Sequence, residues 1–149
     1  MATELHNPAL DALAFLIGDW DIALSNASFL EEGQVASGTV EIRPIEGGRL
    51  LVVRQFAGPG EEPAATWAMG RDGSGPAFTV LYADERGVSR VYEMSVTETT
   101  WSLWRDDPDF SQRFEAAISA DRRRLDGRWE KRIAGGPWEH DFEVTYSRR

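Results

Sequence analysis

The feature that most constrains the fold is a change of hydrophobic period at Gly18. Before it, Leu10, Leu13 and Ile17 recur three or four residues apart, which is helical spacing. After it, short runs alternate apolar and polar residues and are separated by turn residues, which is the pattern of β-strands. The runs lie at 19–25, 34–43, 49–57, 64–71, 77–83, 88–97, 100–105, 112–119, 124–133 and 138–147.

This pattern predicts an all-β protein with one short N-terminal helix. Asn7 is a suitable N-cap and Pro8 suits the first helical position, so the helix is expected over 7–17. Most connections between runs are short enough for hairpins, which favours antiparallel neighbours. An open sheet of so many strands would expose its edges, and closing the sheet removes them. We predict one domain, 1–149, with a ten-stranded antiparallel up-and-down barrel over 19–147; a two-sheet sandwich is the alternative.

Charge and composition argue against several kinds of partner. The net charge of −9 repels the phosphates of nucleic acids and anionic membranes, and the basic run 122–124 sits beside Asp121 and Asp126, as in a solvated turn. The chain contains no cysteine, so disulfides and thiolate metal sites are excluded. Neither a signal peptide nor an apolar run of ~20 residues is evident. We therefore expect a cytoplasmic protein without nucleic-acid or membrane partners, and a homodimer is compatible with these features.

The stretch FLIGDWDI, with Gly18-Asp19-Trp20 after the helix, resembles the calycin barrels: lipocalins, fatty-acid-binding proteins and nitrobindin. The resemblance is greatest to a bacterial calycin-like family of unsettled activity, over nearly the full length. It is carried by GGRLLVVRQF, GVSRVYEMS, WSLWRDDPDFSQRF and GRWEKRIAGGPWEHDFEVTYSR. It implies a calycin-like barrel in which the tryptophan lies beneath an arginine of the last strand, here Arg148 or Arg149.

The run 88–97 places Arg90 and Tyr92 on its more apolar face. An arginine and a tyrosine two residues apart resemble the carboxylate clamp of fatty-acid-binding proteins, because a guanidinium fork and a phenol both donate to a carboxylate. The alternative is that Arg90 pairs with an acidic neighbour, Glu93 or Asp84.

His140 lies in the middle of an alternating run in which Trp138, Phe142 and Tyr146 share its face. A histidine inside the barrel can be a hydrogen-bonded core residue, a group that recognises a polar ligand, a metal or haem ligand, or a general base. The resemblance to nitrobindin implies the haem alternative, since nitrobindin-like proteins bind haem through a histidine near the C-terminus. A zinc site is not expected, because the other histidine is His6, far away in the sequence.

Aromatic residues recur on the predicted inward faces, among them Trp67, Trp101 and Trp138. They either pack the core or line a cavity, since a barrel ten strands wide can leave its interior partly empty. The polar groups Tyr82 and Arg71 are predicted to join them. The segment 26–32 is expected to be a flap or a one-turn helix over an opening.

These features favour binding or sequestration of a small apolar or amphipathic ligand, with an anionic end suited to the arginines. The predicted ligand-binding residues are His140, Arg90, Tyr92, Tyr82, Arg71, Trp67, Trp101 and Trp138. No catalytic motif and no metal site is predicted, and no cofactor is expected apart from the haem alternative at His140. The alternatives are an enzyme that uses His140 as acid–base with Tyr82 or Tyr92, and a barrel with a filled interior.

Overall fold

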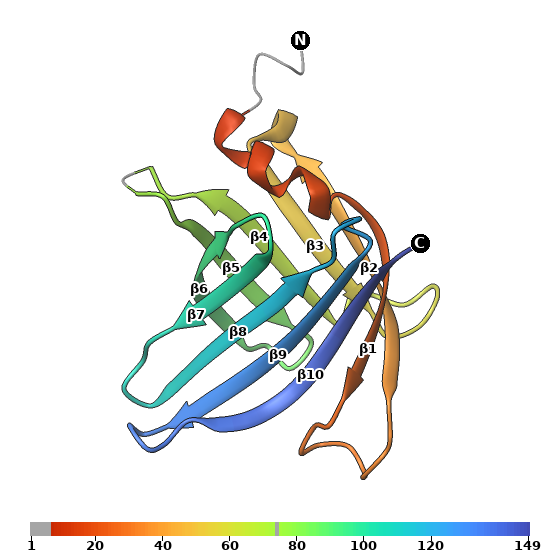
Figure 1. Ribbon diagram of the computed structural model, residues 1–149, viewed down its shortest axis with the longest axis vertical. Coiled ribbons are helices and arrows are strands. Elements are labelled where there is room, and N and C mark those ends of the chain that lie inside the picture. The colour runs from red at the N-terminus through yellow and green to blue at the C-terminus, as the bar shows by residue number, and fades with distance from the viewer. Residues whose placement is uncertain (1–6, 74) are drawn as a thin grey trace.

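Ten antiparallel strands form one closed barrel, in which each strand pairs with its neighbours in sequence and β1 pairs with β10 (Figure 1). The structure is a computed structural model that describes residues 7–73 and 75–149. The strands are β1 (Gly18–Ser25), β2 (Ala36–Ile45), β3 (Leu50–Phe56), β4 (Ala65–Arg71), β5 (Phe78–Asp84), β6 (Ser89–Val96), β7 (Thr100–Arg105), β8 (Phe110–Ile118), β9 (Arg124–Ile133) and β10 (Glu139–Arg148). The predicted all-β fold class and the up-and-down order are confirmed.

Every predicted run is a strand, and the boundaries agree to within two residues. A clear difference is the start of β8, which was predicted at Gln112 and lies at Phe110. The carboxylate of Asp107 accepts hydrogen bonds from the backbone N–H groups of Asp109 (2.9 Å) and Phe110 (3.3 Å). The turn is therefore complete before Phe110, which is free to begin the next strand.

The N-terminal helix η1 (Pro8–Leu16) is a 3-10 helix. As predicted, the side chain of Asn7 caps it by accepting from the N–H of Ala9 (3.0 Å). Its buried residues are Leu10, Leu13 and Leu16, while Ile17, the last residue of the predicted period, follows the helix as its C-cap and is partly buried against the core. With three residues per turn, side chains at i, i+3 and i+6 eclipse one another, whereas the predicted face assumed 3.6. A second 3-10 segment, η2 (Glu46–Gly48), joins β2 to β3.

Helix η1 lies at one end of the barrel, next to the start of β1 and the end of β10 (Figure 1). Beneath it Trp20 is fully buried and donates from its indole nitrogen to the carbonyl of Leu16 (2.8 Å). The Arg148 guanidinium lies 4.2 Å from the centre of the Trp20 ring and donates to the carbonyls of Ile17 (2.9 Å) and Phe15. This end of the barrel is therefore closed by a tryptophan and an arginine.

Of the two arginines that the resemblance left open, it is Arg148 that covers Trp20. Arg149 is exposed and lies 3.4 Å from Asp21 on the surface. Gly18 explains the first position of the Gly-x-Trp pattern: its φ is 140°, and a Cβ there would lie 2.5 Å from the Arg148 Nη1 atom. A larger residue at position 18 would push this guanidinium aside and would be held in a backbone conformation that L-residues rarely adopt.

Aromatic side chains fill the half of the interior next to this closed end. The Trp101 ring lies 5.6 Å from that of Tyr146 and 5.2 Å from that of Phe114. Gly127 makes room for Phe114, because a Cβ there would lie 2.4 Å from its ring. This half is a packed core, as expected for a barrel whose side chains interdigitate.

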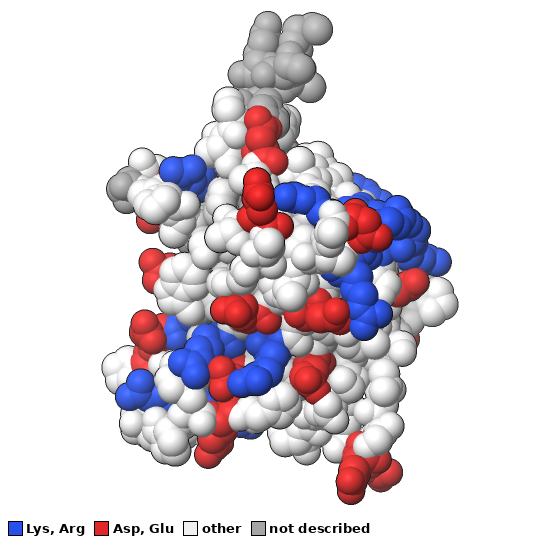
Figure 2. All heavy atoms as spheres, in the orientation of Figure 1, with Lys and Arg blue, Asp and Glu red and all other residues white. Residues whose placement is uncertain are grey.

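Charged groups of both signs are interspersed over the face of the molecule seen in Figure 2.

Residues 119–123 form the predicted turn between β8 and β9, in which the backbone N–H of Ser119 donates to the carbonyl of Arg124 (2.9 Å). Arg122 lies over the ring of Phe15 at 4.9 Å, against helix η1. Among the helices of the described residues, none has the length and apolarity needed to cross a membrane.

Candidate functional site

The half of the barrel opposite Trp20 is hollow and holds a cavity of about 680 Å³. The loops that line its rim are those that join β1 to β2 (Ser28 and Phe29), β3 to β4 (Ala64) and β5 to β6 (Glu85 and Arg86). The residues that line it are Ile22, Leu24, Ser28, Phe29, Gln55, Ala64, Ala65, Trp67, Tyr82, Asp84, Glu85, Arg86, Arg90, Tyr92, Leu103, Phe110, Gln112, Trp129, Lys131, Ile133, Asp141, Phe142, Val144 and Tyr146. A cavity of this volume falls in the range of small-molecule sites.

Aromatic rings follow one another around the cavity wall. The ring centres of Trp67 and Tyr82 are 6.3 Å apart, and those of Tyr82 and Tyr92 are also 6.3 Å apart. From Tyr92 the series continues to Trp129 (5.7 Å) and from there to Phe142 (6.1 Å). Consecutive rings come from β4, β5, β6, β9 and β10, so the wall is held by strands rather than by loops.

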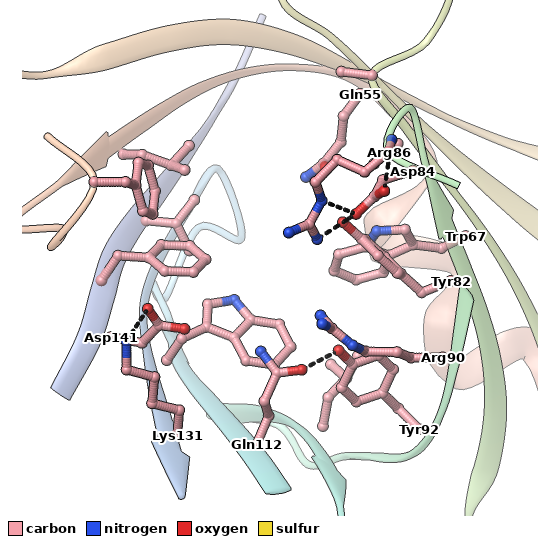
Figure 3. Close-up of a pocket in the computed structure, with 18 of the residues that line it drawn as sticks. Gln55, Trp67, Tyr82, Asp84, Arg86, Arg90, Tyr92, Gln112, Lys131 and Asp141 are labelled. Carbon is pink, nitrogen blue, oxygen red and sulfur yellow. Dashed lines mark hydrogen bonds and ion pairs between the residues drawn. The ribbon is translucent and has the colours of Figure 1, made fainter. Parts of the chain in front are cut away.

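Arg90, Tyr92 and Gln112 form a polar group on one wall of the cavity (Figure 3). The hydroxyl of buried Tyr92 donates to the Oε1 atom of Gln112, which is itself only 6% exposed. Burial raises the pKa of the Tyr92 phenol, and the neighbouring Arg90 guanidinium opposes this. The phenol is therefore protonated at neutral pH and orients the Gln112 amide, turning its NH₂ group away from Tyr92.

Arg90 is a cation without a carboxylate partner within the described part of the chain. Its guanidinium lies 4.9 Å from the centre of the Phe110 ring. The alternative expectation, that Arg90 pairs with Glu93 or Asp84, is not what the structure shows. Glu93 accepts from the indole of Trp104 (2.9 Å) on the outer face, and Asp84 is occupied by another arginine.

That arginine is Arg86, which belongs to a hydrogen-bonded cluster at the rim. The Asp84 carboxylate accepts from the Arg86 Nη2 atom (2.6 Å) and from the Tyr82 hydroxyl (2.7 Å). The hydrogen bond from Arg86 is the main reason why the pKa of Asp84 lies well below its usual value. Burial and the bond to Asp84 raise the pKa of Tyr82. The cluster is internally neutral and fixes the β5–β6 loop.

On the opposite side of the cavity, Lys131 of β9 lies 3.7 Å from Asp141 of β10 (Figure 3). Asp141 points inward because β10 carries a bulge between His140 and Phe142, which pair with Glu130 and Trp129. A bulge places one extra residue in a strand and changes which side chains face inward.

The same bulge overturns the expectation that His140 lies inside the barrel. His140 is exposed, and its Nε2 atom lies 2.9 Å from the carbonyl oxygen of Asn26 in the β1–β2 loop. The Asn26 side chain in turn donates to Glu143. Beyond the bulge the predicted face is correct, since Phe142 and Tyr146 both line the cavity. His140 thus fastens a loop from outside the cavity.

Four predicted site residues line the cavity together: Trp67, Tyr82, Arg90 and Tyr92. Besides His140, three lie elsewhere. Trp101 faces inward but is buried in the packed half, where it donates to the Met94 sulfur (3.1 Å).

Arg71 ends β4 at the closed end of the barrel. It is exposed and donates to the carbonyl of Gly75 (2.7 Å), so the expectation that it enters the cavity is wrong. Trp138 precedes the bulge and lies outside, with the Arg113 guanidinium 4.1 Å from its ring. Its expected inward position is wrong for the same reason as that of His140: the alternation does not run through the bulge.

Several lining residues were not predicted. Gln112 and Lys131 share strand faces with Phe114 and Trp129, so alternation could have found them. Asp141 could not be found in this way, because the bulge reverses its face. Phe29 belongs to the segment expected as a flap; it lines the rim, and its ring lies 5.7 Å from that of Phe142.

Comparison with known proteins supports the fold. No protein-family model matches the chain, and no curated protein sequence matches it. Among solved structures, the chain is similar to Rv2717c from M. tuberculosis, with a TM-score of 0.63 and 16% sequence identity. The match covers 97% of this chain and 99% of that one, so the whole barrel is shared.

Proposed function

We propose that this barrel binds and sequesters a small amphipathic molecule in its cavity. The observation that carries the proposal is a hollow of about 680 Å³, sealed at one end and walled by aromatic rings, in which Arg90 has no carboxylate partner among the described residues. Apolar walls with a few convergent polar groups are typical of small-molecule sites. Arg90 and Tyr92 would meet the polar end of the ligand, and the series from Trp67 to Phe142 would contact its apolar part.

The expected affinity follows from burial and from one charged contact. Burying about 200 Å² of apolar ligand surface contributes roughly 5 kcal/mol before the costs of association. A hydrogen-bonded ionic contact to Arg90 adds about 1.5–3 kcal/mol. An anionic end is favoured because it would neutralise Arg90, which has no carboxylate partner among the described residues.

The alternatives that use His140 have no support from the geometry. Its ring lies outside the cavity, so it is not placed to serve as an axial haem ligand or as an acid–base group for a molecule inside. Tyr82 and Tyr92 have raised pKa values and are suited to donate hydrogen bonds rather than to accept protons. Within the residues described, no cluster of three or more metal-ligating side chains occurs.

We further propose that the barrel is calycin-like. The support is the closed end, where Gly18, Trp20 and Arg148 occupy the places that the resemblance implies. A cytoplasmic location, a bacterial origin, a homodimer and the lack of nucleic-acid or membrane partners stay predictions from the sequence.

Native mass spectrometry of freshly purified protein is the direct test. We expect an added mass that disappears on denaturation, together with saturable binding of the recovered compound. Arg90→Met should weaken that binding about tenfold without unfolding the barrel, because it removes a charged hydrogen bond. Arg71→Met is the matched control, since Arg71 lies outside the cavity, and should bind as wild type does. A bare mass, followed by failure of the protein to bind any small amphipathic anion, would refute the proposal.

A further inference from the structure

We infer that the ligand is a planar aromatic monocarboxylate, held by its carboxylate between Arg90 and Gln112. This inference rests on the proposed function and specifies the chemistry of the same cavity. The composition of the wall restricts the shape of the ligand, the unused hydrogen-bond donors restrict its polar group, and the balance of charge restricts its net charge.

The wall favours flat rings over an alkyl chain. Eight of the 24 lining residues are aromatic, against 11% of the whole chain, so rings are concentrated at the cavity. Neighbouring rings present both edges and faces: the planes of Tyr82 and Tyr92 meet at 85°, whereas Trp129 and Phe142 are stacked at 25°. Contacts between aromatic rings are more favourable than the apolar area they bury accounts for. An alkyl chain would gain only the area term.

The unused donors favour a carboxylate. The NH₂ group of Gln112 has no partner among residues 7–73 and 75–149, although the side chain is buried and points into the cavity (Figure 3). Beside it stand the Arg90 guanidinium and Trp129, whose indole N–H is also unpaired within the same residues. A planar acceptor with two oxygens matches a guanidinium fork and an amide NH₂. An acceptor-rich ligand would supply partners for these donors, which the described part of the protein leaves unused.

The charges favour a single negative charge. Of the three cations that line the cavity, Arg86 is held by Asp84 at 2.6 Å and Lys131 by Asp141 at 3.7 Å. Of these three cations, Arg90 alone has no carboxylate partner among the described residues. Glu85 lies exposed at the rim, where solvent screens its charge. A dianion would bring a second charge into the cavity without a free cation to meet it.

Isothermal titration calorimetry with three probes tests the inference. The probes are 2-naphthoate, octanoate, which has the same charge on an alkyl chain, and 2-naphthalenemethanol, which has the ring without the charge. We expect 2-naphthoate to bind at least about tenfold more tightly than either. In Gln112→Met the affinity for 2-naphthoate should fall about fivefold, the effect of one lost hydrogen bond. The affinity of the same variant for 2-naphthalenemethanol should stay unchanged. Arg71→Met is the control.

The outcomes separate this inference from the proposed function. Octanoate binding as tightly as 2-naphthoate would overturn the aromatic ligand but leave a binding cavity. An equal loss of the acid and the alcohol in Gln112→Met would overturn the carboxylate position. If Gln112→Met does not fold, Arg90→Lys takes its place: it keeps the charge but loses the fork, and should also weaken only the acid. Failure of all three probes to bind would overturn this inference, and it would overturn the proposed function as well only if the native mass is bare and no other small amphipathic anion binds.

Discussion

Replacing Arg148 by methionine removes the charged group at the closed end of the barrel and keeps a side chain of similar length. The wild-type guanidinium lies 4.2 Å from the centre of the Trp20 ring and donates to the carbonyls of Ile17 and Phe15. Each hydrogen bond to a charged donor is worth about 1.5 kcal/mol at the lower end of its range. The cation–π contact adds about 0.5–1 kcal/mol at a partly exposed site. We expect Arg148→Met to lower the free energy of unfolding by about 3–4 kcal/mol.

Urea denaturation followed by far-ultraviolet circular dichroism measures this loss, which corresponds to a fall of roughly 10 °C in Tm for a chain of this size. The control is Arg149→Met, the neighbouring residue. Arg149 forms only an exposed ion pair with Asp21, with side chains 57% and 61% exposed, and its loss should cost less than about 0.5 kcal/mol. Equal effects of the two substitutions would refute the view that Arg148 stabilises the closed end.

Two further predictions concern the rim of the cavity. Asp84→Asn should lower the free energy of unfolding at neutral pH, because the hydrogen bond from Arg86 to the carboxylate is lost. The pKa of Asp84 is lowered in the folded state. The difference in unfolding free energy between wild type and variant should therefore be complete above about pH 5 and shrink as the pH falls below about 4. Urea midpoints at pH 7 and pH 3.5 check this, and a constant difference between them would contradict it. His140→Ala should release 2-naphthoate about fivefold faster, because one hydrogen bond to Asn26 that holds the β1–β2 loop is lost. Stopped-flow dissociation measures that rate, and an unchanged rate would show that the loop does not control release.

Alternation predicted the interior well where strands run without interruption. On β6 it placed Arg90 and Tyr92 on the same inward face, because side chains along a regular strand have a period of two. It failed on β10, where the bulge at Asp141 moves His140 outside. Nothing in the sequence around the bulge marks it, since Glu139, Asp141 and Glu143 fit the polar face equally well.

The alternation of apolar and polar residues also does not show how far along the barrel axis an inward-facing residue lies. Trp67 and Trp101 both face inward and their rings lie 6.1 Å apart, yet only Trp67 lines the cavity. Which of the two borders the hollow half depends on the stagger between strands around the closed barrel, and that is a property of the whole sheet. Arg71 illustrates the same limit, because it shares a strand face with Trp67 but lies at the sealed end.

The seal formed by Trp20 and Arg148 gives the cavity the geometry of a cup rather than that of a tunnel. A molecule taken up by a cup must depart through the opening by which it arrived. Loading and unloading cannot take place at once, and no second molecule can push the first out from behind. Any macromolecule that received a bound molecule would have to face the rim, where His140 fastens the β1–β2 loop.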